Sequence, residues 1–430
     1  MVGAEVIESR PVANVTQALQ GAVPGLNLTV GGNGGDLNSG MNINIRGAGS
    51  IGSGSTDKPL ILIDGIEGDL NTLNPNDVES VSVLKDAASA SIYGSRAAFG
   101  VILVTTKSGK AGKVRVNYSG DVRFSTATQT PDMVDSYRFA TYFNAASINN
   151  GGQAQFNEEQ MEKILKFQRG EFNDPTQPEY YGTTANLNNK KWNNYGGAFA
   201  NTDWFDYFYK NKSLRHSHNL SIFGGSDKVT YYVGLGYTYQ GGLLDRVEDS
   251  LDKYNVNTKF QIKPNDWLKF NFNNNITLNL ISRPLPDMSI LYHQIARSQP
   301  NMVTEVPISG LYNLPSWNEA LYLDNVGYSQ NRISDAMTFA ATVTPLKGWD
   351  IIGEMKVRFD VQNDEFLQKQ PRTTRPDGTI ENVTAPRQGY SYPGIEYSNS
   401  LWGSMTRGNQ FNYYLSPSVS SSYTLSLIHI

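Results

Sequence analysis

A chain of 430 residues with 36 basic and 40 acidic side chains carries a net charge of −4, which gives no global case for nucleic-acid binding. The absence of cysteine excludes disulfides, thiolate metal sites and thiol nucleophiles. No apolar run approaches the roughly 18 residues of a transmembrane helix, but a membrane β-barrel stays compatible, since its strands are apolar on one face only.

The first 110 residues are rich in glycine and contain only short apolar runs. In chain order we expect a short helix at 15–20, a strand at 41–45, an apolar strand at 59–63 with an Asp64-Gly65 turn, a capped turn at 74–77, a strand at 78–84, an alanine-rich helix at 86–93 closed by Gly94, and a strand at 100–106. Segments 41–46, 60–64, 79–84 and 100–106 are expected to form one sheet. The pattern predicts a small mixed α/β unit.

From residue 111 onward the pattern changes to long amphipathic strands. We expect eight of them, at 114–124, 215–223, 229–239, 253–263, 267–281, 333–343, 349–361 and 411–423. Side chains alternate between the two faces of a strand. We therefore expect one set of side chains to face lipid (Leu268, Phe270, Phe272, Val357 and Phe359) and an alternating set to face a lumen (Lys269, Asn271, Lys356 and Arg358).

The connections between these strands alternate in length. The short ones are 224–228, 263–266 and 344–348, and the long ones are 125–214, 240–252, 282–332 and 362–410. Short turns at one end and long loops at the other are typical of an outer-membrane barrel, whereas a soluble β-sandwich does not explain such long excursions. The predicted fold is a small α/β plug domain followed by an antiparallel transmembrane β-barrel.

We expect that barrel to be incomplete. A lumen that holds a folded domain needs roughly 22 strands, far more than the sequence contains. The expected structure is therefore an open, curved sheet around part of the plug, with strands 114–124 and 411–423 as free edges.

Motifs of catalysis and cofactor binding are weak. Residues 47–52 match G-x-G-x-x-G, but a loop follows instead of the helix that a dinucleotide site requires, so no cofactor is expected. His216 and His218 share one face of a strand, and two ligands do not make a zinc site, so no metal is expected. No Ser-His-Asp arrangement stands out, so we expect no catalytic residues and no enzyme.

Two groups of side chains are candidates for ligand contact. The loop 192–209 contains Trp192, Tyr195, Trp204 and Tyr207, whose rings suit stacking against a sugar, or alternatively packing within the loop or an interfacial aromatic girdle. Lys356 and Arg358 alternate with acidic residues on the predicted lumen face. They form either a charged track for a solute or ordinary solvated charges on the wall.

A series of short motifs identifies a family resemblance in the first region. These are ALQG at 18–21, PGL at 24–26, IRG at 45–47, PLILIDG at 59–65, NDVE at 76–79, VLKDA at 83–87, YGSR at 93–96 and GVI at 100–102. In this order they resemble the plug of SusC/RagA-like TonB-dependent outer-membrane transporters. The positions that carry the plug signature are Arg46, Gly47, Asp64, Gly65, Asp77, Lys85, Asp86, Tyr93, Gly94, Arg96 and Gly100.

The resemblance implies a location in the bacterial outer membrane and a division into a TonB-dependent receptor plug domain (1–110) and the N-terminal portion of the barrel (111–424). It implies import of a nutrient, typically a glycan or oligosaccharide and sometimes a peptide, energised by the TonB complex and assisted by a SusD-like surface lipoprotein. A passive porin or adhesin is the alternative. No nucleic acid is expected as a partner.

The two ends of the sequence also carry expectations. Neither a signal peptide nor the TonB-contacting segment of the family is recognisable before the plug, so we expect the sequence to be a fragment. Residues 425–430 match a translated sequencing adapter, and we expect them to be non-native.

Overall fold

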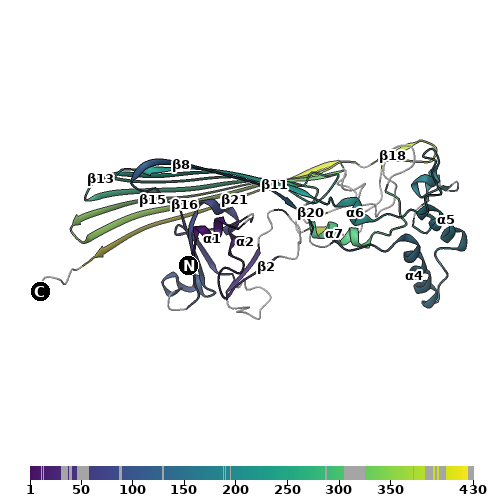
Figure 1. Cartoon of the computed structure of the whole chain (residues 1–430), viewed down its shortest axis with the longest axis horizontal. Helices are drawn as coiled ribbons and strands as arrows, with labels where there is room; N and C mark the ends of the chain where they lie inside the picture. The colour runs from purple at the N-terminus through teal and green to yellow at the C-terminus, as the bar shows by residue number, and fades with distance from the viewer. Residues whose placement is uncertain are drawn as a thin grey trace.

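The computed structural model (Figure 1) places a small mixed unit against one face of a long strand sheet. It describes residues 1–424 except for 11, 13, 31–36, 38–40, 46–57, 87–89, 128–129, 187, 189, 194, 286–287, 305–324, 371, 383–390, 393–394 and 397–402. The expectation for residues 425–430 therefore lies outside the described residues.

The small unit is built on a five-stranded sheet within its described residues, in the order β1-β6-β7-β4-β5. The strands are β1 (Val2–Gly3), β4 (Leu60–Ile63), β5 (Ile66–Glu67), β6 (Val78–Leu84) and β7 (Val101–Thr106). β4 and β7 run parallel, and the other neighbours are antiparallel. The helices are α1 (Ala4–Glu8) and α2 (Val15–Leu19), with 3-10 turns η1 (Leu70–Thr72), η2 (Pro75–Asp77) and η3 (Ser91–Ala97).

The larger of two apolar clusters in the described part of this unit packs its helices against its sheet. Ile7 from α1, Leu19 from α2 and Ile102 from β7 are fully buried in it. The side chain of Asn14 caps α2 by accepting a hydrogen bond from the Gln17 backbone N–H at 2.9 Å, so the helix begins where the sequence predicted. The short apolar runs thus form a closed core of their own, as expected for a mixed α/β unit.

One expectation for this unit was wrong, and another is confirmed in part. Segment 41–46 does not join the main sheet: β3 (Met41–Ile45) instead pairs with β2 (Leu26–Val30), a strand the pattern had not indicated. The helix expected at 86–93 is present in part: Ala90 is α-helical, with its N–H bonded to the Asp86 carbonyl at 3.0 Å, and the 3-10 helix η3 follows it. Gly94 adopts a non-helical conformation with a φ of 67°, which glycine reaches without a steric penalty, so the first helical segment ends there as predicted and a second short turn follows.

The large sheet confirms all of the expected strands. Its eight described members are β8 (Gly112–Ser125), β11 (Ser213–Gly225), β12 (Val229–Gly241), β13 (Ser250–Asn265), β14 (Leu268–Arg283), β15 (Val326–Leu346), β16 (Trp349–Gln368) and β21 (Ser404–Tyr423). Each pairs antiparallel with its neighbour in the chain order of the set. In the described part of the chain β8 and β21 are the outermost strands and do not pair with each other, so the sheet is open as predicted.

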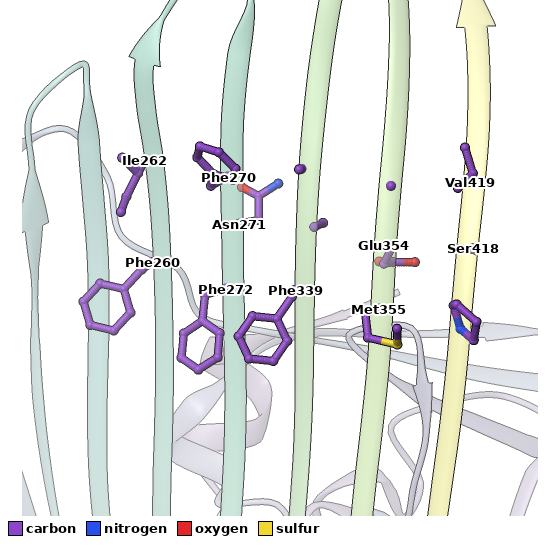
Figure 2. Close-up of a pocket in the computed structure, with 14 residues that line it drawn as sticks. Phe260, Ile262, Phe270, Asn271, Phe272, Phe339, Glu354, Met355, Ser418 and Val419 are labelled. Atoms are coloured by element: carbon purple, nitrogen blue, oxygen red, sulfur yellow. The ribbon is translucent and has the colours of Figure 1, made fainter.

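The two faces of this sheet differ in chemistry. On the face turned away from the small unit, Phe260, Phe272, Phe339 and Met355 lie in a row across neighbouring strands (Figure 2). The rings of Phe272 and Phe339 are 4.9 Å apart, and a groove of about 440 Å³ lies between these side chains. Lys356 and Arg358 reach the small unit from the opposite face, which confirms the predicted orientation of these two side chains.

The long connections gather at one end of the sheet, and the short turns lie at the other (Figure 1). The connections contain α4 (Ser136–Asn149), α5 (Glu158–Gln168), η4 (Pro178–Tyr181), η5 (Tyr195–Gly197), α6 (Trp204–Phe208) and α7 (Met288–Arg297), with the short pairs β9 (Ala185–Asn186) and β10 (Lys191–Trp192), β17 (Arg372–Thr374) and β18 (Ile380–Asn382), and β19 (Ser391–Tyr392) and β20 (Ile395–Glu396). Among the described helices none is long and apolar enough to cross a membrane.

Candidate functional site: the contact between the small unit and the strand sheet

The Asp64-Gly65 turn is held by a buried ion pair. The Lys259 ammonium, from β13, lies 3.0 Å from Asp64 Oδ1 and donates a second hydrogen bond to the Thr106 carbonyl at 2.7 Å. Asp64 also accepts hydrogen bonds from the Thr106 backbone N–H at 3.0 Å and from its hydroxyl at 2.6 Å. The charge on Asp64 is thus fully partnered although its side chain is only 15% exposed, which satisfies the condition for burying a carboxylate.

The 3-10 turn η1 is bound through its backbone carbonyl groups. Lys253 Nζ donates to the Asn71 carbonyl at 2.5 Å. The Thr72 carbonyl accepts hydrogen bonds from Asn255 Nδ2 at 2.8 Å and from the Thr277 hydroxyl at 2.7 Å. A short helix leaves carbonyl groups without partners at its end. Side chains from β13 and β14 supply those partners, so the sheet completes the hydrogen bonding of the turn.

The following turn, η2, makes two side-chain contacts with the sheet. The Tyr232 hydroxyl donates to Asp77 Oδ1 at 2.7 Å, and Asn74 Nδ2 donates to Asn219 Oδ1 at 2.7 Å. All four side chains are buried. Burial raises the pKa of Asp77 to about 6, opposed by the hydrogen bond from Tyr232 and by the charge of Lys107.

This raised pKa predicts that the attachment of the small unit weakens as the pH rises. The bound state favours the protonated carboxyl of Asp77. Its contribution to the free energy of attachment is therefore complete below the ordinary pKa of about 4 and is lost as the pH passes through 6. Between pH 5 and 7.5 we expect a loss of about 1–2 kcal/mol, measured as the urea dependence of hydrogen exchange in 60–107. Asp77→Asn should remove this difference; an unchanged pH dependence in that variant would contradict the assignment.

A second group of contacts lies on β16. Arg358 donates to the Glu67 carbonyl at 2.6 Å and forms an ion pair with Asp360 at 2.8 Å. Lys356 pairs with Glu354 at 2.9 Å, and its ammonium group lies beside Gly65. The two basic residues singled out in the sequence therefore contact the small unit in this structure. Their contact with a ligand stays a prediction.

A polar cavity of about 750 Å³ lies between the small unit and the sheet. Its lining includes Glu67, Asp69 and Arg96 from the small unit and Arg332 from β15. Arg96 forms an exposed ion pair with Glu67 at 3.1 Å. The cavity therefore presents both signs of charge, and its wall comes from both parts of the chain.

Comparison with known proteins agrees with this architecture. The family model of the TonB-dependent receptor plug domain matches residues 1–101. TonB-dependent receptor P26 of Formosa agariphila is 32% identical over 278 residues, which is 63% of this chain and 24% of that protein. TonB-dependent receptor SusC of Bacteroides thetaiotaomicron is 31% identical over 274 residues, 57% of this chain and 22% of that protein. The matches thus span about a quarter of those relatives.

A solved structure of the RagAB peptide importer in its open-open state has the same fold, with a TM-score of 0.72 at 22% identity, covering 100% of this chain and 45% of that chain. The matches agree in the plug and in the open sheet. The chain is thus similar to the plug and part of the barrel of SusC/RagA-like TonB-dependent receptors. The small unit is a TonB-dependent receptor plug domain, and the sheet is a partial barrel whose plug-facing side corresponds to the lumen wall.

Part of the plug signature of this family lies at the contact with the sheet. Asp64, Gly65 and Asp77 are there, as described above. Gly100 has a structural reason: its φ of 92° suits glycine, and an added Cβ would lie 2.8 Å from Ile45 Cδ1. Arg46 and Gly47 lie outside the described residues.

The remaining signature positions lie within the plug. Lys85 follows β6 directly and is half-buried, and the Asp86 carbonyl accepts a hydrogen bond from the Ala90 backbone N–H at 3.0 Å. Tyr93 packs on a small apolar cluster around Val101, and Gly94 forms the kink in η3. None of the contacts described for these four positions reaches the sheet.

The aromatic residues of loop 192–209 are not gathered into one platform in the described part of the loop. Trp204 is fully buried, and its indole N–H donates at 2.9 Å to the carbonyl of Gln299, which belongs to the connection between β14 and β15, so this ring packs between two connections. The Trp192 indole donates instead to the Thr374 carbonyl at 2.9 Å. The guanidinium of Arg246 lies over the ring of Tyr207, 4.1 Å from the centre of that ring. The side chain of Tyr195 is outside the description.

The residues of β11 to β14 that hold the plug were not singled out in the sequence. Lys253, Asn255 and Lys259 lie on one face of β13, two or four positions apart, and alternate with apolar residues such as Val256. Loops in solvent rarely keep a strict alternation of polar and apolar side chains. A polar, partly charged face on a long alternating strand therefore indicates that another part of the protein covers that face. The signal shows which face is polar without showing what the face binds.

Proposed function

We propose that this chain supplies the plug and part of the barrel of an outer-membrane importer that takes up a nutrient with energy from the TonB complex. The observation that carries the proposal is the contact itself. A folded plug is held on the lumen face by hydrogen bonds and ion pairs, and the described contacts of Asp64, Thr72 and Asp77 with the sheet are all polar.

A polar contact suits a plug that must be displaced. Groups such as Lys253 and Asn255 can exchange a protein carbonyl for water when the plug moves, at a small net cost per hydrogen bond. An apolar contact of the same size would oppose movement through the full hydrophobic cost of exposing it. The plug is therefore positioned accurately, yet a pulling force can release it.

The likeness to named transporters supports a substrate class. SusC and the RagAB peptide importer are similar to this chain in sequence and fold respectively. We propose a glycan or oligosaccharide as the substrate, with a peptide as the alternative. The charged cavity between plug and sheet lies where a solute would pass, and its mixed charges suit a polar solute. The long connections would face the outside and meet a SusD-like lipoprotein.

The proposal predicts that uptake depends on the proton-motive force. In cells that produce the whole receptor carrying this chain, a protonophore should abolish uptake of candidate oligosaccharides, whereas binding to the cell surface should persist. Cells lacking the gene provide the background. Uptake that continues at an unchanged rate in the presence of the protonophore would instead support the alternative of a passive porin.

A further inference from the structure

Two glycines on the plug-facing side of β12 are placed directly against the plug. Gly234 and Gly236 are two positions apart, so they share the face that also presents Tyr232. A Cβ built on Gly234 would overlap the carboxylate oxygen Oδ1 of Asp77. A Cβ built on Gly236 would overlap the amide nitrogen Nδ2 of Asn74.

Such close approach explains why glycine stands in the middle of this strand. Glycine weakens a strand because it gains no side-chain packing and loses more backbone freedom than other residues. Both glycines lie in the interior of β12, where they pair in register with Asn257 and Asn255 of β13 on one side and with Ser221 and Asn219 of β11 on the other. By contrast, a Cβ added to Gly353 of β16 would meet open space. The loss of strand stability that these two glycines cause in β12 is therefore explained by the space that the plug needs.

We infer that Gly234 and Gly236 form a seat for the plug turn Asn74–Asp77 and thereby fix the position in which the plug closes the lumen. This glycine seat admits the two side chains, and neighbouring groups hold them there. The Tyr232 hydroxyl donates to Asp77, and Asn219 accepts from Asn74, each at 2.7 Å.

Hydrogen bonds within the plug hold the shape of the turn. Asn74 Oδ1 accepts a hydrogen bond from the Asn76 backbone N–H at 3.0 Å, and the Asp77 backbone N–H donates to the Asn74 carbonyl at 3.0 Å. The Lys107 backbone N–H in turn donates to the Asp77 carbonyl at 2.8 Å, which ties the turn to the end of β7. A shift at the seat would therefore move the plug sheet as a body.

The inference rests on the proposed function only in assuming that the plug closes a lumen; it does not require energised import. Gly234→Ala in the whole receptor should displace the plug and let a large hydrophilic antibiotic, normally excluded by the outer membrane, enter the cells. We expect a several-fold fall in its inhibitory concentration. Gly353→Ala changes a strand glycine of the same sheet that lies on the face turned away from the plug and has free space around it, so it should leave the inhibitory concentration unchanged.

Matched second substitutions make the test specific. Asp77→Ala removes the atoms that clash with a Cβ at position 234, so Gly234→Ala with Asp77→Ala should leak less than Gly234→Ala alone. Asn74→Ala should relieve Gly236→Ala in the same way. Two crossed pairs serve as controls: Gly234→Ala with Asn74→Ala, and Gly236→Ala with Asp77→Ala. Neither should reduce the leak, because the side chain that clashes with the new Cβ is still present in each pair.

Two measurements decide the outcome. The amount of each variant in the outer membrane is compared first; if Gly234→Ala fails to assemble, recovery of assembly by Asp77→Ala but not by Asn74→Ala supports the seat equally. The inference would be overturned if the Gly234→Ala receptor excluded the antibiotic as well as the unmodified receptor does. It would also be overturned if matched and crossed partner substitutions reduced the leak equally. Protonophore-resistant uptake would refute energised import and leave the leak result untouched.

Discussion

Replacing Lys259 by methionine should destabilise the attachment of the plug by about 3 kcal/mol, because it leaves the Asp64 carboxylate buried without its charged partner. Methionine keeps most of the volume of the lysine stem, so the change removes charge rather than packing. The urea concentration at which amides in 60–107 lose protection from hydrogen exchange should fall, measured on the whole receptor in detergent micelles.

The control lies on the same strand. Lys263 pairs with Asp266 at 3.2 Å, but the Asp266 side chain is fully exposed, so Lys263→Met should change the same midpoint very little. Adding Asp64→Asn to Lys259→Met should recover much of the loss, since the uncompensated charge is then gone. Equal effects of the Lys259 and Lys263 substitutions would show that the buried pair does not hold the plug.

Replacing Phe272 by arginine should cost about 2–4 kcal/mol in the membrane-embedded receptor, because an arginine on the lipid-facing surface loses its hydration there. Phe272 lies within the aromatic row between Phe260 and Phe339 (Figure 2), so its ring contacts would be lost as well. The free energy of unfolding in lipid vesicles, from urea titration, measures the effect.

The neighbouring residue provides the comparison. Asn271 is adjacent in β14 and points to the plug side of the sheet, so Asn271→Arg should cost about 0–1 kcal/mol. A similar cost at both positions would mean that the apolar row does not face lipid.

Hydrogen exchange on an isolated fragment of residues 1–110 gives an independent check on the plug. The amides of β6 and β7 should be protected in the absence of the sheet. A lack of protection there would contradict a plug that folds by itself.

Much of the fold could be read from the sequence because its signals are local. The alternation in segments such as 267–281 assigns side chains to faces regardless of what each face meets, since successive side chains in any strand point in opposite directions. Asn74 and the Asp64-Gly65 pair indicated turns through chemistry within a few residues. The pairing of β2 with β3 was missed because the alternation of a five-residue segment such as Met41–Ile45 indicates a strand without showing which strand it pairs with.

The contact between plug and sheet was decided by the tertiary structure. Lys259 and Asp64 are 195 positions apart, and no local pattern connects an ammonium on a strand with a carboxylate in a turn. The same holds for Tyr232 and Asp77, and for the two glycines of β12 that leave room for the turn. The sequence by itself determined the strands, their faces and the plug motifs, because these depend on neighbours along the chain. Which polar residue meets which carbonyl or carboxylate depends on how two separately folded parts pack, and only their packing could decide it.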